Sequence, residues 1–232
     1  TRHSSFECGT VDYVPPTYAA RGTTPSSSNI TSKCVKWYWE TDYDVYVNKG
    51  SVTNVNAYMQ GVFNQVATLY ANDGLAISLK TLFVWTSADP YTGPNSSDYL
   101  NQFVGYRTTW DGDLAHLISF TGAGGIAYLN GITACQYTTS QVSSQKGYSG
   151  VSGSYNTVPT YSFTVECIAH EQGHQLGSNH THDCVWNGNN TKIDDCGGAA
   201  GYSAGSCAPE PNPAVPRSEE HTSELQSPYV IS

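Results

Sequence analysis

The stretch 170–180, with the sequence HEQGHQLGSNH, holds the residues of this chain best suited to chemistry. His170 and His174 are four residues apart, so on a helix they share one face, about 40° apart around the axis. Their imidazoles can therefore reach a common metal ion. His180 would point roughly to the opposite side of a continued helix. It can join the same metal only if the helix stops, and Gly177 stands where glycine can take the left-handed conformation that ends helices.

Three neutral imidazoles leave one position of a tetrahedral zinc ion open for water, as in a catalytic rather than a structural site. Glu171 directly follows the first histidine and is placed to take a proton from that water. The stretch therefore predicts one catalytic Zn²⁺ ion and a hydrolytic reaction. The alternative is a helix that carries three satisfied surface histidines.

The elements that must position this helix show in the pattern of apolar residues. Apolar residues at alternate positions predict a half-buried strand over 35–47. A helix should begin at Ser51, because an apolar stripe at helical spacing follows it: Val52, Val55, Met59, Val62, Phe63, Val66, Leu69 and Tyr70. Further apolar runs predict strands over 75–85 and 114–120, a helix over 98–106 and a short strand over 126–129.

The polar, Gly/Ser-rich residues 136–160 predict a long loop, and Ser162 is a plausible N-cap for the helix of the metal motif. Val165, Ile168, Ala169 and Leu176 should form the buried side of that helix. His116 lies in an apolar stretch and is expected to be a satisfied core histidine. Together the elements predict an α/β or α+β upper subdomain, followed by a small, irregular lower subdomain.

Composition narrows the possible partners and location. The chain has 232 residues, a net charge of -9 and 12% charged residues, and it has no basic cluster of the kind that nucleic acids require. No apolar run reaches membrane-spanning length. The low charge and the plentiful Gly, Ser, Thr and Asn are typical of a secreted protein. We therefore expect an extracellular, monomeric protein without nucleic-acid partners.

The seven cysteines are expected to form disulfides in an oxidising compartment, because none of them belongs to a C-x-x-C pair. Their odd number leaves one thiol without a partner in this chain. Cys8 could be a pro-region thiolate that blocks zinc, but a disulfide with Cys34 is the interpretation we favour. The sequence does not determine the connectivity. The cysteines are Cys8, Cys34, Cys135, Cys167, Cys184, Cys196 and Cys207.

The pattern H-E-x-x-H-x-x-G-x-x-H at 170–180 is the signature of the metzincin zinc endopeptidases, and its chance occurrence in this chain is on the order of one in ten thousand. The chain also resembles the reprolysin-like (adamalysin-type) branch, especially its secreted bacterial members. The matching segments are Asp42-Tyr43-Asp44, Val84-Trp85, Asp89-Pro90-Tyr91, 124–128 and 180–186.

The resemblance implies a zincin-like fold, with a twisted mixed sheet, two or three helices and a disulfide-stapled lower subdomain. It also implies that His170, His174 and His180 bind zinc, and that Glu171 is general base and acid for a protein or peptide substrate. An edge strand would bind the substrate antiparallel through the unpaired main chain that edge strands offer. Its residues would be Gly124, Gly125, Ile126, Ala127 and Tyr128.

Two departures from the family pattern bear on these expectations. The family has a methionine turn beneath the zinc, whereas the single methionine here is Met59. Residues 217–227 resemble the in-frame translation of a sequencing adapter, so we expect the catalytic domain to be cut short before this turn. We therefore divide the chain into an N-terminal loop or pro-region remnant (1–33), a truncated catalytic domain (34–216) and an artefactual tail (217–232). The residue after the third histidine is Thr181, where adamalysins have Asp.

Several further roles remain open. His182 and Asp183 could be ligands, but a structural or solvated role is favoured because three histidines complete the ligand set. Asp42 and Asp44 could bind Ca²⁺, although their spacing matches no known calcium loop, so the sequence does not support such a site. A metzincin fold without turnover, acting as a binding module, is the functional alternative. An inactive fragment that lacks the methionine turn is another.

Overall fold

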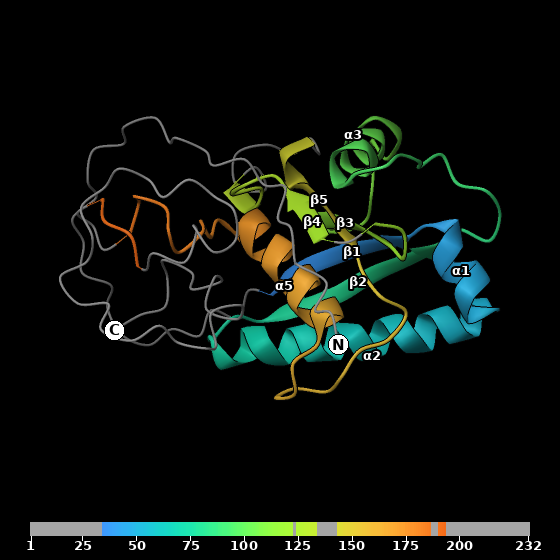
Figure 1. The fold of residues 1–232 in the computed structure, drawn as a ribbon, viewed down its shortest axis with the longest axis horizontal. Coiled ribbons are helices and arrows are strands. Elements are labelled where there is room, and N and C mark those ends of the chain that lie inside the picture. Colours follow the sequence, from blue (N-terminus) through green and yellow to red (C-terminus); the bar gives the residue numbers. More distant parts are fainter. Residues whose placement is uncertain (1–33, 123, 134–142, 187–189, 194–232) are drawn as a thin grey trace.

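A mixed five-stranded sheet is the centre of the computed structural model (Figure 1), which describes residues 34–122, 124–133, 143–186 and 190–193. The strands lie in the order β2-β1-β3-β5-β4. The first four run parallel to one another, and β4 is antiparallel to β5 at one edge. The bounds are β1 (Val35–Thr41), β2 (Ile77–Val84), β3 (Leu114–Ser119), β4 (Gly124–Ala127) and β5 (Lys146–Gly150). The predicted α/β class with a mixed sheet is confirmed.

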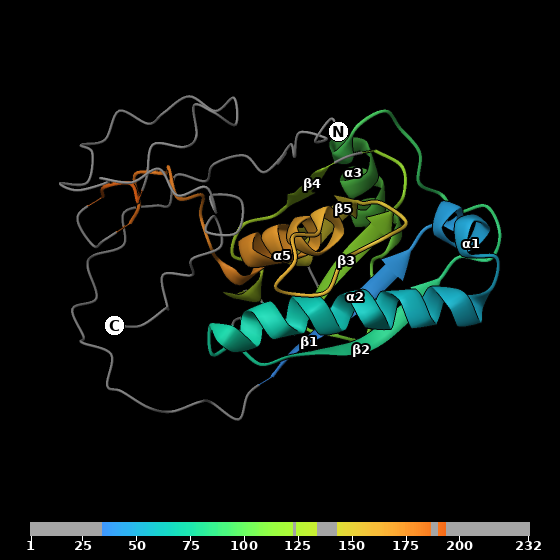
Figure 2. The same ribbon diagram turned by 60° about the horizontal axis from the view of Figure 1, so that its bottom comes forward.

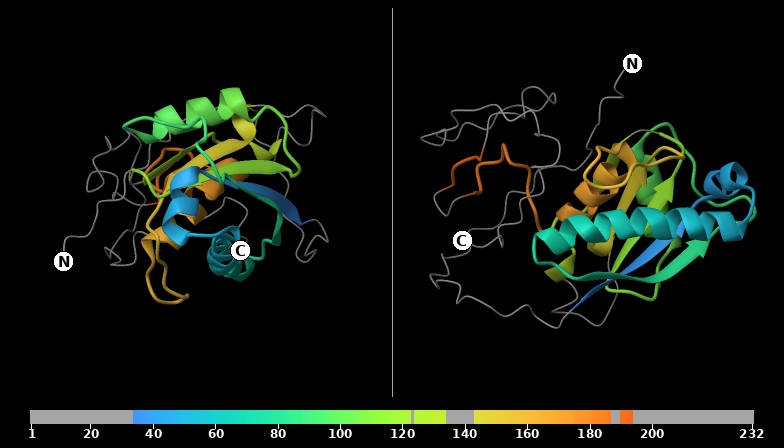
Figure 3. Two further views of the ribbon diagram at one scale, coloured as in Figure 1. Left: turned by 90° about the vertical axis from the view of Figure 1, so that its right-hand side faces the viewer. Right: turned by 90° about the horizontal axis from the view of Figure 1, so that it is seen from below.

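Helices cover both faces of this sheet. Helices α2 and α5 lie side by side on one face, and α3 lies on the other (Figures 2 and 3). The short helix α1 follows β1 directly. The helices are α1 (Tyr43–Lys49), α2 (Val52–Asn72), α3 (Ser96–Tyr106) and α5 (Phe163–Leu176), with a 3-10 turn at Ser143–Gln145 before β5.

Strand β1 is buried on both faces rather than half-buried as predicted. Trp37 and Trp39 pack into the core beneath α2 and α5, whereas Tyr38 packs into the second core beneath α3. A parallel strand covered by helices on both faces is expected to be buried throughout. The alternation of residues therefore reflects two different cores, not a core and a solvent face.

The predicted strand over 35–47 was wrong in its second half, because the chain enters α1 at Tyr43. A short apolar alternation fits either element, and packing decides between them. In the helix, Val45 is buried in the main core while Val47 is 60% exposed. Helix α2 begins where it was predicted, since Ser51 Oγ accepts a hydrogen bond from Asn54 N at 3.1 Å. Val52, the first residue of the predicted apolar stripe, is however 40% exposed.

The predicted loop over 136–160 was also wrong in part, because it contains the buried strand β5. Its sequence, KGYSG, shows no apolar alternation. Gly147 occupies a place with no room for a side chain: a Cβ there would lie 2.6 Å from Gln175 Oε1 and 2.9 Å from His116 Nδ1. This strand therefore uses glycine to let α5 and β3 approach closely, which conceals it from pattern analysis.

His116 is the satisfied core histidine that was predicted. Its Nδ1 lies 2.8 Å from Gln175 Oε1, and its Nε2 lies 2.9 Å from Ser149 Oγ. Burial lowers the pKa of His116 to about 4, so the ring is neutral at pH 7. His116 therefore joins β3, β5 and α5 without taking part in a metal site.

Among the described cysteines, Cys34 and Cys167 are free thiols. The favoured Cys8–Cys34 disulfide is therefore not formed. Cys184 is disulfide-bonded. Residues 1–33, most of the predicted lower subdomain and the tail 217–232 lie outside the described residues, so the predicted domain division stays a prediction. None of the described helices has the length and apolar character that a membrane span needs.

Candidate metal centre

Helix α5 places His170 and His174 one above the other, with both side chains about 1% exposed. Their Nε2 atoms are 3.0 Å apart, and their rings meet edge to face with centroids 4.6 Å apart. The helix begins after Ser162, the predicted N-cap, although the Ser162 side chain makes no capping hydrogen bond. The i, i+4 spacing thus converges as the sequence indicated.

The chain reverses direction where the sequence predicted. Helix α5 ends at Leu176, and Gly177 has φ 104° in the left-handed region. The amide of Ser178 then donates to Gly173 O at 2.9 Å, which closes the helix end. This turn brings the His180 ring to 4.6 Å from the ring of His174. One ligand atom of each of the three histidines lies within 4.8 Å of the others.

These three imidazoles fit a zinc ion. Nitrogens bound to tetrahedral zinc are roughly 3.3 Å apart, close to the 3.0 Å between the two helical histidines. His174 Nδ1 donates to Ser178 O at 2.8 Å, so its Nε2 keeps the lone pair that a metal needs. Burial, with smaller effects from neighbouring histidines, lowers the pKa of His170 well below its usual value and that of His174 to about 3. The rings are neutral, the form that binds metal.

Main-chain contacts hold the third histidine in place. The His180 amide donates to Asp183 Oδ2 at 2.9 Å, and Trp186 Nε1 donates to His180 O at 2.7 Å. The His182 ring stacks on His180 with centroids 5.0 Å apart. Because His182 is only 2% exposed, the solvated role considered for it is excluded. His180, His182 and Asp183 form a second group of possible ligand atoms.

A model of the family Reprolysin_5, described as metallo-peptidase family M12, matches residues 31–214. The chain belongs to metallopeptidase family M12. A solved structure described as "Structure of a chaperone-substrate complex" is similar to this M12 metallopeptidase over 65% of our chain, with 13% sequence identity and a TM-score of 0.45. The similar region spans 24% of that chain, and a likeness this distant does not bear on function.

The edge strand of this M12 metallopeptidase lies against Glu171 of α5. Strand β4 pairs with β5 and is the last strand of the sheet among the described residues. Of the five residues predicted to bind substrate at this edge, four fall within β4. The fifth, Tyr128, follows the strand and donates its amide to Lys146 O at 3.2 Å. A Cβ on Gly125 would lie only 2.3 Å from Glu171 Cγ. Glycine at this position thus lets the edge strand approach Glu171 closely.

Sequence reasoning missed the residues that hold the three histidines in place without being candidate ligands themselves. Ser178 acts through its carbonyl, which any residue type would supply, so no sequence signal could have revealed it. Trp186 was noted only as part of the resemblance, and its contact with the main chain of His180 follows from the fold. The Asn130 amide, which donates to His174 O at 2.7 Å, likewise ties the segment after β4 to the end of α5.

Proposed function

We propose that this M12 metallopeptidase is a secreted zinc endopeptidase of the reprolysin-like branch, with His170, His174 and His180 as zinc ligands. The convergence of these three buried imidazoles beside Glu171 is the observation that carries the proposal. The low fraction of charged residues and the cysteine content support secretion. Detection of the protein in the culture medium of its source, rather than in cell lysate, tests this part.

The chain's own residues have distinct tasks in the proposed reaction. Bound zinc would supply a Lewis acid that polarises the scissile carbonyl and acidifies a water molecule. Glu171, fully buried on α5, accepts the proton of the attacking water and passes it to the leaving amine. The edge of β4 that faces away from β5 aligns an extended peptide antiparallel beside that carboxylate. Gly124, Gly125, Ile126, Ala127 and Tyr128 contribute this edge.

Replacement of the base separates catalysis from metal binding. Glu171→Gln should retain zinc, measured by elemental analysis, and lose at least a hundredfold in casein or quenched-peptide cleavage, as expected when a general base is removed. Asp111→Asn is the matched control, because Asp111 is exposed and its ion pair with Lys80 is long at 3.8 Å. The control should keep both zinc and activity.

The outcomes separate the rival functions. Full activity of Glu171→Gln would contradict the assignment of the base. Zinc binding by the unmodified chain without cleavage of any peptide would favour a binding module or an inactive fragment. A chain that binds no zinc at neutral pH would refute the metal centre itself.

A further inference from the structure

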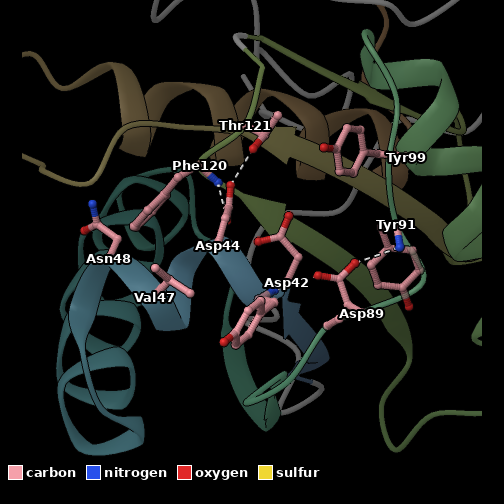
Figure 4. Close-up of a pocket in the computed structure, with 11 residues that line it drawn as sticks. Asp42, Asp44, Val47, Asn48, Asp89, Tyr91, Tyr99, Phe120 and Thr121 are labelled. Carbon is pink, nitrogen blue, oxygen red and sulfur yellow. Dashed lines mark hydrogen bonds between the residues drawn. The ribbon is translucent and has the colours of Figure 1, made fainter.

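A second candidate site, lined by acidic residues, lies where three neighbouring strands end. A pocket of about 590 Å³ opens beyond the carboxyl ends of β1, β2 and β3 (Figure 4), and its lining residues include none from α5. Asp42 follows β1, Asp89 follows the end of β2, and Phe120 and Thr121 follow β3. Crevices at the carboxyl ends of parallel strands are common ligand sites in α/β folds.

Two of the three aspartates in this pocket are already oriented by hydrogen bonds. Asp44 accepts hydrogen bonds from Phe120 N at 3.1 Å and from Thr121 Oγ1 at 2.6 Å. Asp89 accepts hydrogen bonds from the amides of Tyr43 at 2.8 Å and Tyr91 at 2.7 Å. These hydrogen bonds fix the orientation of both carboxyl groups. At Asp44 burial raises the pKa, but the hydrogen bonds outweigh burial and lower the pKa below its usual value.

Asp42 stands between these two carboxylates (Figure 4) and is 3% exposed. Its Oδ1 is buried and has no hydrogen-bond partner among the described residues. A buried carboxylate oxygen without a partner is costly, because it has lost its water without replacement. Burial, together with Asp44 and then Asp89, raises the pKa of Asp42 to about 9. Among the described residues that line the pocket there is no Lys or Arg to pair with the three carboxyl groups.

We propose that this pocket binds a calcium ion through Asp42, Asp44 and Asp89. Calcium prefers six to eight oxygen ligands in flexible geometry and accepts carboxylates together with water. The three carboxylates converge less closely than the metal-centre histidines, since they are not among the described groups with all ligand atoms within 4.8 Å. At least one of them therefore binds through water. The residues come from two loops and a helix start, which explains why their spacing in the sequence resembles no calcium loop.

Calcium at this place would tie three strand ends together. Asp44 already holds the Phe120–Thr121 segment that leads from β3 toward β4, and Thr121 O accepts a hydrogen bond from Tyr148 on β5 at 2.7 Å. Asp89 holds the start of α1 through Tyr43. Without a cation the raised pKa keeps a proton on Asp42 at pH 7; a bound cation would displace that proton and link the three carboxylates. Its effect is on stability and does not depend on the proposed peptidase activity.

The test measures calcium binding and thermal stability on the full chain with its zinc retained. Titration calorimetry should give a dissociation constant of about 10⁻⁴ M, typical of extracellular calcium sites. At 5 mM CaCl₂ the melting temperature should rise by roughly 5 °C over NaCl of equal ionic strength. Asp42→Asn should weaken binding at least tenfold and melt no lower than the calcium-free wild type, since the amide adds no charge. Asp111→Asn, outside the pocket, should bind calcium like the wild type.

A second measurement needs no variant. Terbium(III), a calcium substitute, should show luminescence sensitised by the nearby Tyr43, Tyr91 and Tyr99, and calcium should reverse it. The rival occupant is a proton shared between Asp42 and Asp44, which requires no metal. Absence of calcium binding would overturn the calcium site in favour of the shared proton. Unchanged affinity in Asp42→Asn, or terbium emission that calcium does not displace, would show that the metal binds elsewhere and would overturn this site as well.

Discussion

At the scale of single residues, the approach of β4 to Glu171 is the contact most closely connected with the proposed chemistry. A general base works only when its carboxylate is held within hydrogen-bond reach of the water it deprotonates. Gly125 has no side chain where a Cβ would lie 2.6 Å from both Glu171 Cδ and Glu171 Oε1. The backbone of Gly125 is not in the left-handed region, so space alone demands glycine there.

Gly125→Ala should therefore lower peptide cleavage at least tenfold while zinc stays bound, because the added methyl must push Glu171 or the edge strand aside. Overpacking of this kind also costs about 1–3 kcal/mol of stability. Gly105→Ala on α3 is the control: nothing lies within 4 Å of a Cβ at Gly105, so its activity should not change. Equal cleavage by Gly125→Ala and wild type would show that the base does not work from this position.

The sequence could reveal the three histidines and Glu171 because one helix and one turn bring them together over eleven residues. Local geometry is enough to predict such a site. Gly125 and Asp89 could not be found in this way. Gly125 meets Glu171 from another element, and Asp89 joins Asp42 only once β1 and β2 are paired in parallel. Contacts of this kind depend on the packing of the whole sheet.

At the scale of elements, the same distinction separates correct from wrong predictions. Helix α2 has one buried face, with Met59 fully buried, so its apolar stripe showed both its type and its start. Strand β5 lies between two strands and under α5, where close approach rather than apolar surface selects its residues. In the segment after Asp42, a few apolar residues fit both periodicities. Tertiary packing determines the structure of β5 and of the segment after Asp42, so no local sequence pattern could predict it.

The end of α5 is the element boundary on which the metal centre depends. A non-glycine residue in the left-handed region costs about 1 kcal/mol, so Gly177→Ala should lower the free energy of unfolding by about that amount. Asn130 Oδ1, 3.0 Å from the position of the added methyl, adds crowding. The shifted turn should also weaken zinc affinity about tenfold, as loss of support around metal ligands does.

Gly50→Ala is the matched control for this prediction. Gly50 ends α1 with φ 77° and has nothing within 4 Å of a Cβ, far along the chain from the histidines. It should lose similar stability and keep its zinc affinity, measured by competition with a chromophoric chelator. Equal zinc affinities in the two variants would show that the turn at Gly177 does not position His180.

At the scale of the whole molecule, a buried ion pair joins strand β1 to the end of helix α3, which covers one face of the sheet. Glu40 on β1 is fully buried, and its carboxylate accepts a hydrogen bond from Arg107 Nε, at the end of α3, at 2.6 Å. The Glu40 carboxylate also accepts hydrogen bonds from the hydroxyls of Tyr38 and Tyr91 and from the Trp85 indole, each at 2.6–2.7 Å. One carboxylate thus connects β1, the segment after β2 and α3.

Arg107→Met should lower the free energy of unfolding by about 3 kcal/mol, because it leaves the Glu40 charge buried without its cation. Lys80→Met is the control: its ion pair with Asp111 spans 3.8 Å between exposed side chains, so its loss should cost less than about 1 kcal/mol. Urea denaturation with comparison of m-values measures both. If the cost arises from the uncompensated charge, Glu40→Met in the Arg107→Met background should recover part of the loss, since an apolar pair can replace a buried ion pair at little cost. Greater instability of the double variant would instead assign the stabilisation to the tyrosine and tryptophan hydrogen bonds that Glu40 accepts.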